Sequence, residues 1–178
     1  MLKEITQFID DKSKIVAWGF SQQWTVGTNL FAGHVPVKNF AGVDIPVRYL
    51  AVLENAGGAV LSNVGGVVAT TPPSNLLDPN YKCTYFPKYI EKAVQLLNRA
   101  NSYFVARTDA EELYEAFHQT AGWNLPRITT MGILGPQYQA IVIDAYGPPA
   151  PVGNPDEKGL FQFSTNYVWK IEEASCGA

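Results

Sequence analysis

Cysteine and histidine, on which many metal and nucleophile sites depend, are scarce in this chain. There are two of each, namely Cys83, Cys176, His34 and His118. They lie far apart in the sequence, so no pair has the short spacing of zinc ligands and a disulfide framework is not indicated. This cysteine usage favours synthesis in a reducing compartment. We therefore expect no metal site and no bound cofactor.

Charge is also in short supply. Charged residues make up 16% of the chain, against roughly a quarter in typical soluble domains. The net charge of −3, without a basic stripe, argues against a dedicated nucleic-acid-binding protein. Aromatic residues reach 12%, and this balance favours a protein that buries part of its surface in an assembly. A monomer rich in uncharged polar residues explains the composition equally well.

Long apolar runs are missing too. No stretch reaches the length of a membrane-spanning helix, and the N-terminal MLKEITQFIDDKSK lacks the basic and apolar regions of a signal peptide. We expect no membrane association. With 178 residues, the chain is predicted to form a single domain, residues 1–178.

Catalytic motifs are absent as well. No Ser or Cys sits in an elbow-type motif, and GAVLSNVGGVV lacks the phosphate-binding glycine patterns. His118 and His34 are interpreted as structural and turn residues. We predict that the chain is not an enzyme. The alternative is a small hydrolase that uses Cys83, which requires this thiol and a histidine to meet in space.

The end of the chain carries the clearest pattern. From Phe161 to Ile171, aromatic and β-branched residues alternate with polar ones, which predicts a half-buried antiparallel strand. The preceding loop, residues 147–158, is made stiff by its prolines and cannot continue a hydrogen-bond ladder. Neither segment carries a nucleophile, a base or a metal ligand, so this region is predicted to present a surface.

Two helices are predicted. Residues 2–12 show an apolar stripe at helical spacing. Thr108 and Glu111 form a capping box, which predicts a second helix that begins there and ends at Gly122. Residues 89–100 fit helix and strand equally, and periodicity does not decide between them. Between residues 14 and 27, the pattern allows an extension of the first helix or a hairpin.

Strands are predicted in several further places. They are a short strand ending at Pro36, residues 48–55, a strand from about Ile128, and Tyr138–Tyr146 after a turn at Gly132–Pro136. Residues 57–87 are rich in turn signals, and we expect a projecting β-arm or loop. Our interface candidates lie in this arm and in the proline loop: Val64, Val67, Val68, Pro72, Pro73, Pro148, Pro149, Pro151 and Asn154.

Four blocks in order resemble one family: VGTNLFAGHVP, YLAVLENAGG, NRANSYFVARTDAEELYEAFHQTAGWNLP and AYGPPAPVGNPDEKGLFQFSTNYVWKI. They are similar to the minor capsid or tail-terminator proteins of tailed bacteriophages with long non-contractile tails. The resemblance implies an α+β fold, in which a mostly antiparallel β-sheet has two α-helices packed on one face, plus the projecting arm. It also implies that residues 95–100 form a strand. The segment from Lys14 to Trp24 is longer than in the family.

The resemblance also implies a function. Such proteins form a homo-oligomeric ring, commonly hexameric, on the end of the tail tube protein, and stop tube polymerisation. The ring then offers a surface to the head–tail connector or stopper protein, and DNA passes through its lumen without specific binding. The expected location is the virion tail or neck, after synthesis in the host cytoplasm. The alternative is another neck component, such as a stopper, head-completion or minor capsid protein.

Overall fold

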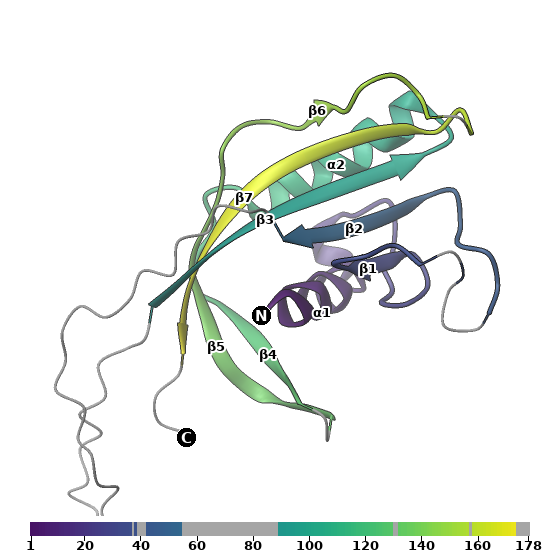
Figure 1. Ribbon diagram of the computed structural model, residues 1–178. Coiled ribbons are helices and arrows are strands. Elements are labelled where there is room, and N and C mark those ends of the chain that lie inside the picture. Colours follow the sequence, from purple (N-terminus) through teal and green to yellow (C-terminus); the bar gives the residue numbers. More distant parts are fainter. Residues whose placement is uncertain (37, 39–41, 55–88, 130–131, 157, 174–178) are drawn as a thin grey trace, which may run out of the picture.

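A curled, mostly antiparallel sheet with two helices on one face makes up the part of the chain that the structure describes (Figure 1). The computed structural model describes residues 1–36, 38, 42–54, 89–129, 132–156 and 158–173. Its elements are α1 (Leu2–Ser13), η1 (Val16–Trp18), β1 (Leu30–Ala32), β2 (Tyr49–Glu54), β3 (Tyr89–Ala100), α2 (Tyr103–Phe117), β4 (Trp123–Thr129), β5 (Gly132–Ala145), β6 (Ala150–Pro151) and β7 (Phe161–Glu173). The expected α+β class is confirmed.

The sheet is built around β7. The strand order is β1-β2-β3-β7-β5-β4, and the short β6 pairs with β7 where β5 has ended. All of these pairs are antiparallel except β1 with β2. β3 pairs with β7 from Tyr89 opposite Glu172 to Ala100 opposite Phe161. Residues 89–100 are therefore a strand, as the resemblance implied.

The alternation in β7 is confirmed, because every second side chain enters the core. On the strand opposite, Val94 and Leu96 face the same side. This periodicity of two places one row of each strand under the helices and leaves the other row at the outer face. The buried row of β7 is Phe163, Thr165, Tyr167, Trp169 and Ile171.

Both helices cover this same face. Phe8 of α1 lies with its ring centroid 5.8 Å from that of Trp169 on β7 and 5.9 Å from that of Phe117 on α2. α1 contacts both ends of the curled sheet, β1 and β2 on one side and β4 on the other (Figure 1). One continuous hydrophobic core therefore joins the two helices to the sheet.

The second helix differs from its prediction at both ends. It begins at Tyr103 after the extended N-cap residue Ser102, so Thr108 lies inside it. It ends at Phe117, because His118 has returned to the extended region, and Gly122 belongs to the turn before β4. The buried stripe explains the early start, since Ala106 and Ala110 precede Leu113 and Phe117 at helical spacing.

The hairpin of β4 and β5 also departs from expectation. β4 begins at Trp123 rather than near Ile128, and residues 132–136 belong to β5 instead of forming a turn. Pro126 and Pro136 face each other where the register shifts. Proline has no N–H to give to a ladder, so both residues are accommodated at this irregularity.

The region before β2 was also only partly anticipated. β1 ends at Ala32, before Pro36, and Gly33 turns the chain with a φ of 76°. The segment after α1 neither extends the helix nor forms a hairpin, but contains the short η1 and the fully buried Trp24. The predicted strand at 48–55 is confirmed as β2.

Candidate functional site

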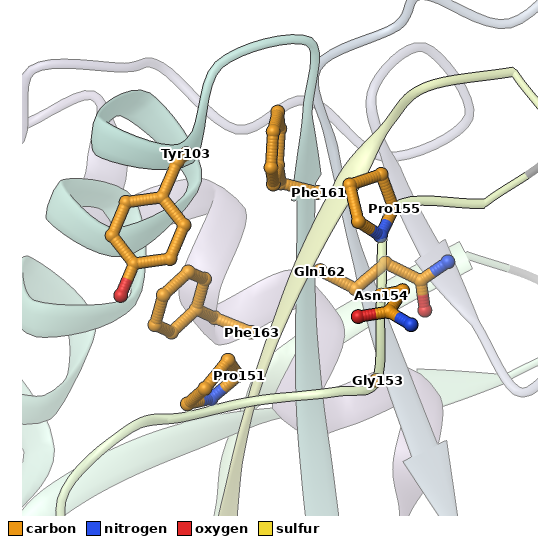
Figure 2. Close-up of a pocket in the computed structure, with 8 residues that line it drawn as sticks. All are labelled: Tyr103, Pro151, Gly153, Asn154, Pro155, Phe161, Gln162 and Phe163. Carbon is orange, nitrogen blue, oxygen red and sulfur yellow. The ribbon is translucent and has the colours of Figure 1, made fainter.

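A surface pocket lies where the N-terminus of α2, the start of β7 and the proline loop meet (Figure 2). Its volume is about 310 Å³, which is within the range of small-ligand sites. Aromatic rings lie on one side and the loop that carries Pro151 and Pro155 on the other. The lining residues are Tyr103, Pro151, Gly153, Asn154, Pro155, Phe161, Gln162 and Phe163.

The aromatic wall is held by ring contacts. The ring centroid of Tyr103 lies 5.1 Å from that of Phe163 and 5.9 Å from that of Phe161, both edge to face. Phe163 is buried and continues into a small apolar cluster with Ala106 and Ala110 of α2. Tyr103 keeps 38% of its surface exposed. The aromatic wall therefore combines one buried ring, Phe163, with one accessible ring, Tyr103.

The proline loop is held against the sheet at two places, and the expectation that it cannot continue a hydrogen-bond ladder was wrong. β6 pairs with β7, and the N–H of Val152 donates to the carbonyl oxygen of Gln162 over 3.0 Å. Further along, Asp156 forms an ion pair with Arg99 of β3. The Asp156 Oδ1 atom also accepts the backbone N–H groups of Lys158 (3.0 Å) and Leu160 (2.8 Å). The second wall of the pocket is therefore ordered before any ligand arrives.

The polar side chains of the pocket are uncharged and form no hydrogen bonds within the described part of the chain. The hydroxyl of Tyr103 and the side-chain amides of Asn154 and Gln162 have no hydrogen-bond partner among the described residues. None of the described lining residues carries a charge. The arrangement suits binding of a neutral ligand through ring contacts and a few hydrogen bonds.

The predicted interface residues have different outcomes. Pro151 and Asn154 line the pocket, whereas Pro148 and Pro149, in the same loop, are not among its described lining residues. The candidates in the arm, together with the arm itself, lie outside the described residues: Val64, Val67, Val68, Pro72 and Pro73.

The aromatic half of the pocket was missed by sequence reasoning. Phe161 and Phe163 were recognised as strand residues only, and Tyr103 lay before the predicted start of the second helix. A weak signal existed in the adjacent Tyr103 and Phe104, two large apolar residues at the beginning of a helix. Both side chains are exposed, Tyr103 to 38% and Phe104 to 75%.

Neither His34 nor His118 is among the described lining residues of the pocket. The backbone N–H of Ala145 donates to Nδ1 of His118 over 3.2 Å, and the ring stacks on Tyr114. His34 is exposed in the turn after β1. In the described part of the chain, no group of three His, Cys, Asp or Glu side chains is arranged to hold a metal. Cys83 lies outside that part, so the hydrolase alternative stays a prediction.

Outside the pocket lining, a polar cluster around Arg48 and Asp109 connects three segments of the chain. Arg48 donates from Nε to Asp109 Oδ2 (2.9 Å) and from Nη2 to Asp109 Oδ1 (2.5 Å). Its Nη2 also donates to Ser21 Oγ, and the Ser21 N–H donates to Glu112. Burial raises the pKa of Asp109, and the hydrogen bonds from Arg48 oppose this shift. The cluster joins the start of β2 and the segment after η1 to α2.

Comparisons with protein-family models, curated proteins and solved structures found no match to this chain. Neither α1 nor α2, the α-helices of the described residues, is long and apolar enough to cross a membrane.

Proposed function

We propose that this chain is a structural virion protein, a tail terminator that caps the tail tube as a homo-oligomeric ring. The resemblance over nearly the whole sequence supports this proposal. The observation that carries it is the number of large apolar side chains on the surface of a chain poor in charge. The most exposed are Val16 (95%), Phe104 (75%), Tyr146 (72%), Val43 (61%) and Val47 (52%).

The exposed apolar side chains form separate patches, and two of these, named patch A and patch B, lie on different faces of the molecule. Patch A is Ile15 and Val16, next to Trp18, which packs into the helical face of the core. Patch B is Val43 and Val47, on either side of Ile45. Ile45 packs on the cluster of Phe31, Tyr49 and Ala51, whose side chains are separate from the core under the helices. Separate patches are what a closed ring requires, because its head-to-tail contacts join two unlike surfaces.

The third apolar region belongs to the pocket end of the molecule. Phe104 follows Tyr103 there, and Val152 is in the proline loop beside the pocket. In the proposed ring, patches A and B join neighbouring subunits. The pocket end stays free for the tail tube protein or for the connector or stopper protein that joins the head.

Mass in solution tests the ring directly. We expect the purified chain, alone or after addition of tail tubes that lack their terminator, to form closed rings of one size. Light scattering and negative-stain images give the mass and the shape. A protein that stays monomeric alone and never binds tube ends contradicts the proposal, and binding to portal complexes instead favours the other neck component.

A pair of variants connects the ring to patch A. Val16→Asp puts a charge at a nearly fully exposed position, so the fold is retained while an apolar contact between subunits is lost. We expect it to shift the protein to monomers. Tyr146→Asp introduces the same charge at an exposed site outside both patches and outside the described pocket lining, and should leave the ring intact. Equal behaviour of the two variants contradicts the assigned interface.

A further inference from the structure

We propose that the pocket beside Tyr103 is a docking site for an uncharged, proline-containing extended segment of a partner protein. The proposal rests on the proposed function only for the assembly in which the partner is found. The pocket chemistry stands on its own, and it narrows the partner to one kind of peptide.

The first argument is the lining. Tyr103, Phe161 and Phe163 supply three aromatic rings, and Pro151, which lies beside Phe163, and Pro155 supply two proline rings (Figure 2). Shallow aromatic grooves of this kind bind polyproline II segments, whose rings pack flat and whose backbone is already ordered. The pocket holds about 310 Å³, enough for a short extended stretch.

The second argument is the set of free hydrogen-bond donors. Tyr103 carries a hydroxyl, and Asn154 and Gln162 carry side-chain NH₂ groups, all without partners among the described residues. A polyproline II backbone makes no internal hydrogen bonds, so its carbonyl oxygens are available as acceptors. An apolar helix face would cover these donors and leave them unsatisfied, at a cost of about 1–3 kcal/mol each.

The third argument is charge. None of the described lining residues is charged, and Asp156, next to Pro155 of the lining, is paired with Arg99. A stacked nucleic-acid strand needs cations for its phosphates, and the lining supplies none. An uncharged peptide loses no ion hydration on entering this site.

The fourth argument is order. The loop wall is fixed before binding by β6 and by the Asp156–Arg99 pair. A polyproline segment is likewise ordered in the free state. Association of two ordered surfaces loses little conformational entropy, which offsets the small contact area.

Titration of the isotope-labelled full chain tests the site. The probe is acetylated, amidated hexaproline, and the comparison peptide is a Gly-Ser repeat of equal length with the same ends. We expect saturable shifts of the Asn154 and Gln162 side-chain amide signals with hexaproline alone. Equal shifts with the Gly-Ser peptide, shifts confined to other regions, or no shift at millimolar peptide overturn the proposal.

Variants separate ring stacking from hydrogen bonding. Tyr103→Ala should weaken hexaproline binding at least about tenfold, because it removes the accessible ring of the wall. Tyr103→Phe keeps the ring and should weaken binding about threefold through loss of the hydroxyl donor. Tyr146→Ala removes an exposed tyrosine that does not line the pocket, so binding should be unchanged. An unchanged affinity in Tyr103→Ala overturns the proposal.

Other occupants give distinct results. Pocket shifts that depend on protein concentration without peptide identify a second copy as the occupant, and tighter binding of oligothymidylate there identifies single-stranded DNA. Both overturn the proposal. A protein that binds hexaproline but stays monomeric and never binds tube ends contradicts the ring alone, whereas rings that bind no hexaproline contradict the docking site alone.

Discussion

At the scale of single residues, the pair of Asp109 and Arg48 has the largest electrostatic consequence. The Asp109 carboxylate is 1% exposed, and Arg48 is the cation that contacts it. A buried carboxylate without its partner destabilises the folded state strongly, since neither water nor a cation then compensates its charge. The same pair connects α2 to two segments that precede it in the chain.

We expect Arg48→Met to lower the free energy of unfolding by about 3 kcal/mol at neutral pH. The loss should shrink in acid. Burial raises the folded-state pKa of Asp109 above its ordinary value of 3.8, and removal of Arg48 raises it further. Protonation of Asp109 therefore contributes to the stability of the folded state. This contribution has its full size below pH 3.8 and is lost as the pH rises through the higher folded-state pKa.

Urea unfolding across a pH series measures this effect. The control is Arg107→Met, which breaks an exposed pair with Glu111 on α2 and should change the stability little, because solvent screens this pair. A loss in Arg48→Met that is as small as in the control, or that grows toward acid pH, contradicts the assigned role of the buried pair.

At the scale of elements, the proline loop depends on Asp156. This carboxylate accepts two backbone N–H groups of its own turn and pairs with Arg99 on β3. We expect Asp156→Ala to open the loop locally, so that amide exchange at Leu160 and Val152 accelerates at least about tenfold. The exchange rates of the central strand pair, β3 with β7, should stay unchanged.

Hydrogen exchange followed by NMR measures both parts of that prediction. Lys170→Met is the matched control, because it removes an ion pair between β7 and β3 without touching the loop. Exchange that accelerates throughout the sheet in Asp156→Ala, or equally in the control, argues against a local anchor. Hexaproline should also bind Asp156→Ala more weakly, since the loop wall is then less ordered.

At the scale of the whole molecule, the sheet and both helices share one core. Its members include Ile5 and Phe8 of α1, Phe117 of α2 and Trp169 of β7. No element of the described chain buries its apolar face separately from this core, apart from small flanking clusters. Such a shared core favours a single cooperative unfolding transition.

We therefore expect two-state unfolding in urea. Far-UV circular dichroism reports on the helices and sheet, and fluorescence reports on the four tryptophans, of which Trp24 and Trp169 are fully buried. The two curves should have the same midpoint at a protein concentration where the chain is monomeric. Separate midpoints, or a fluorescence change before the loss of secondary structure, contradict a single cooperative core.

Much of the architecture follows from local pattern. The alternation from Phe161 to Ile171 identified the central strand, and the apolar stripe at residues 2–12 identified α1. Both patterns are periodic, and they depend only on residues that are close together in the sequence. The capping box at Thr108 misled for the opposite reason, since a local motif was outweighed by the longer buried stripe that packs on β3 and β7.

The sequence predicted only the loop side of the candidate site and not its aromatic side. Prolines restrict their own backbone, so the sequence by itself pointed to a stiff surface segment at residues 147–158, and Pro151 and Asn154 were named from it. The sequence did not predict that Ala150 and Pro151 pair with β7. The position of Tyr103 against Phe161 and Phe163 depends on the β3–β7 register and on where α2 begins. Contacts between residues far apart in the sequence arise from packing, and for that reason only the tertiary structure decided that this loop forms one wall of an aromatic pocket.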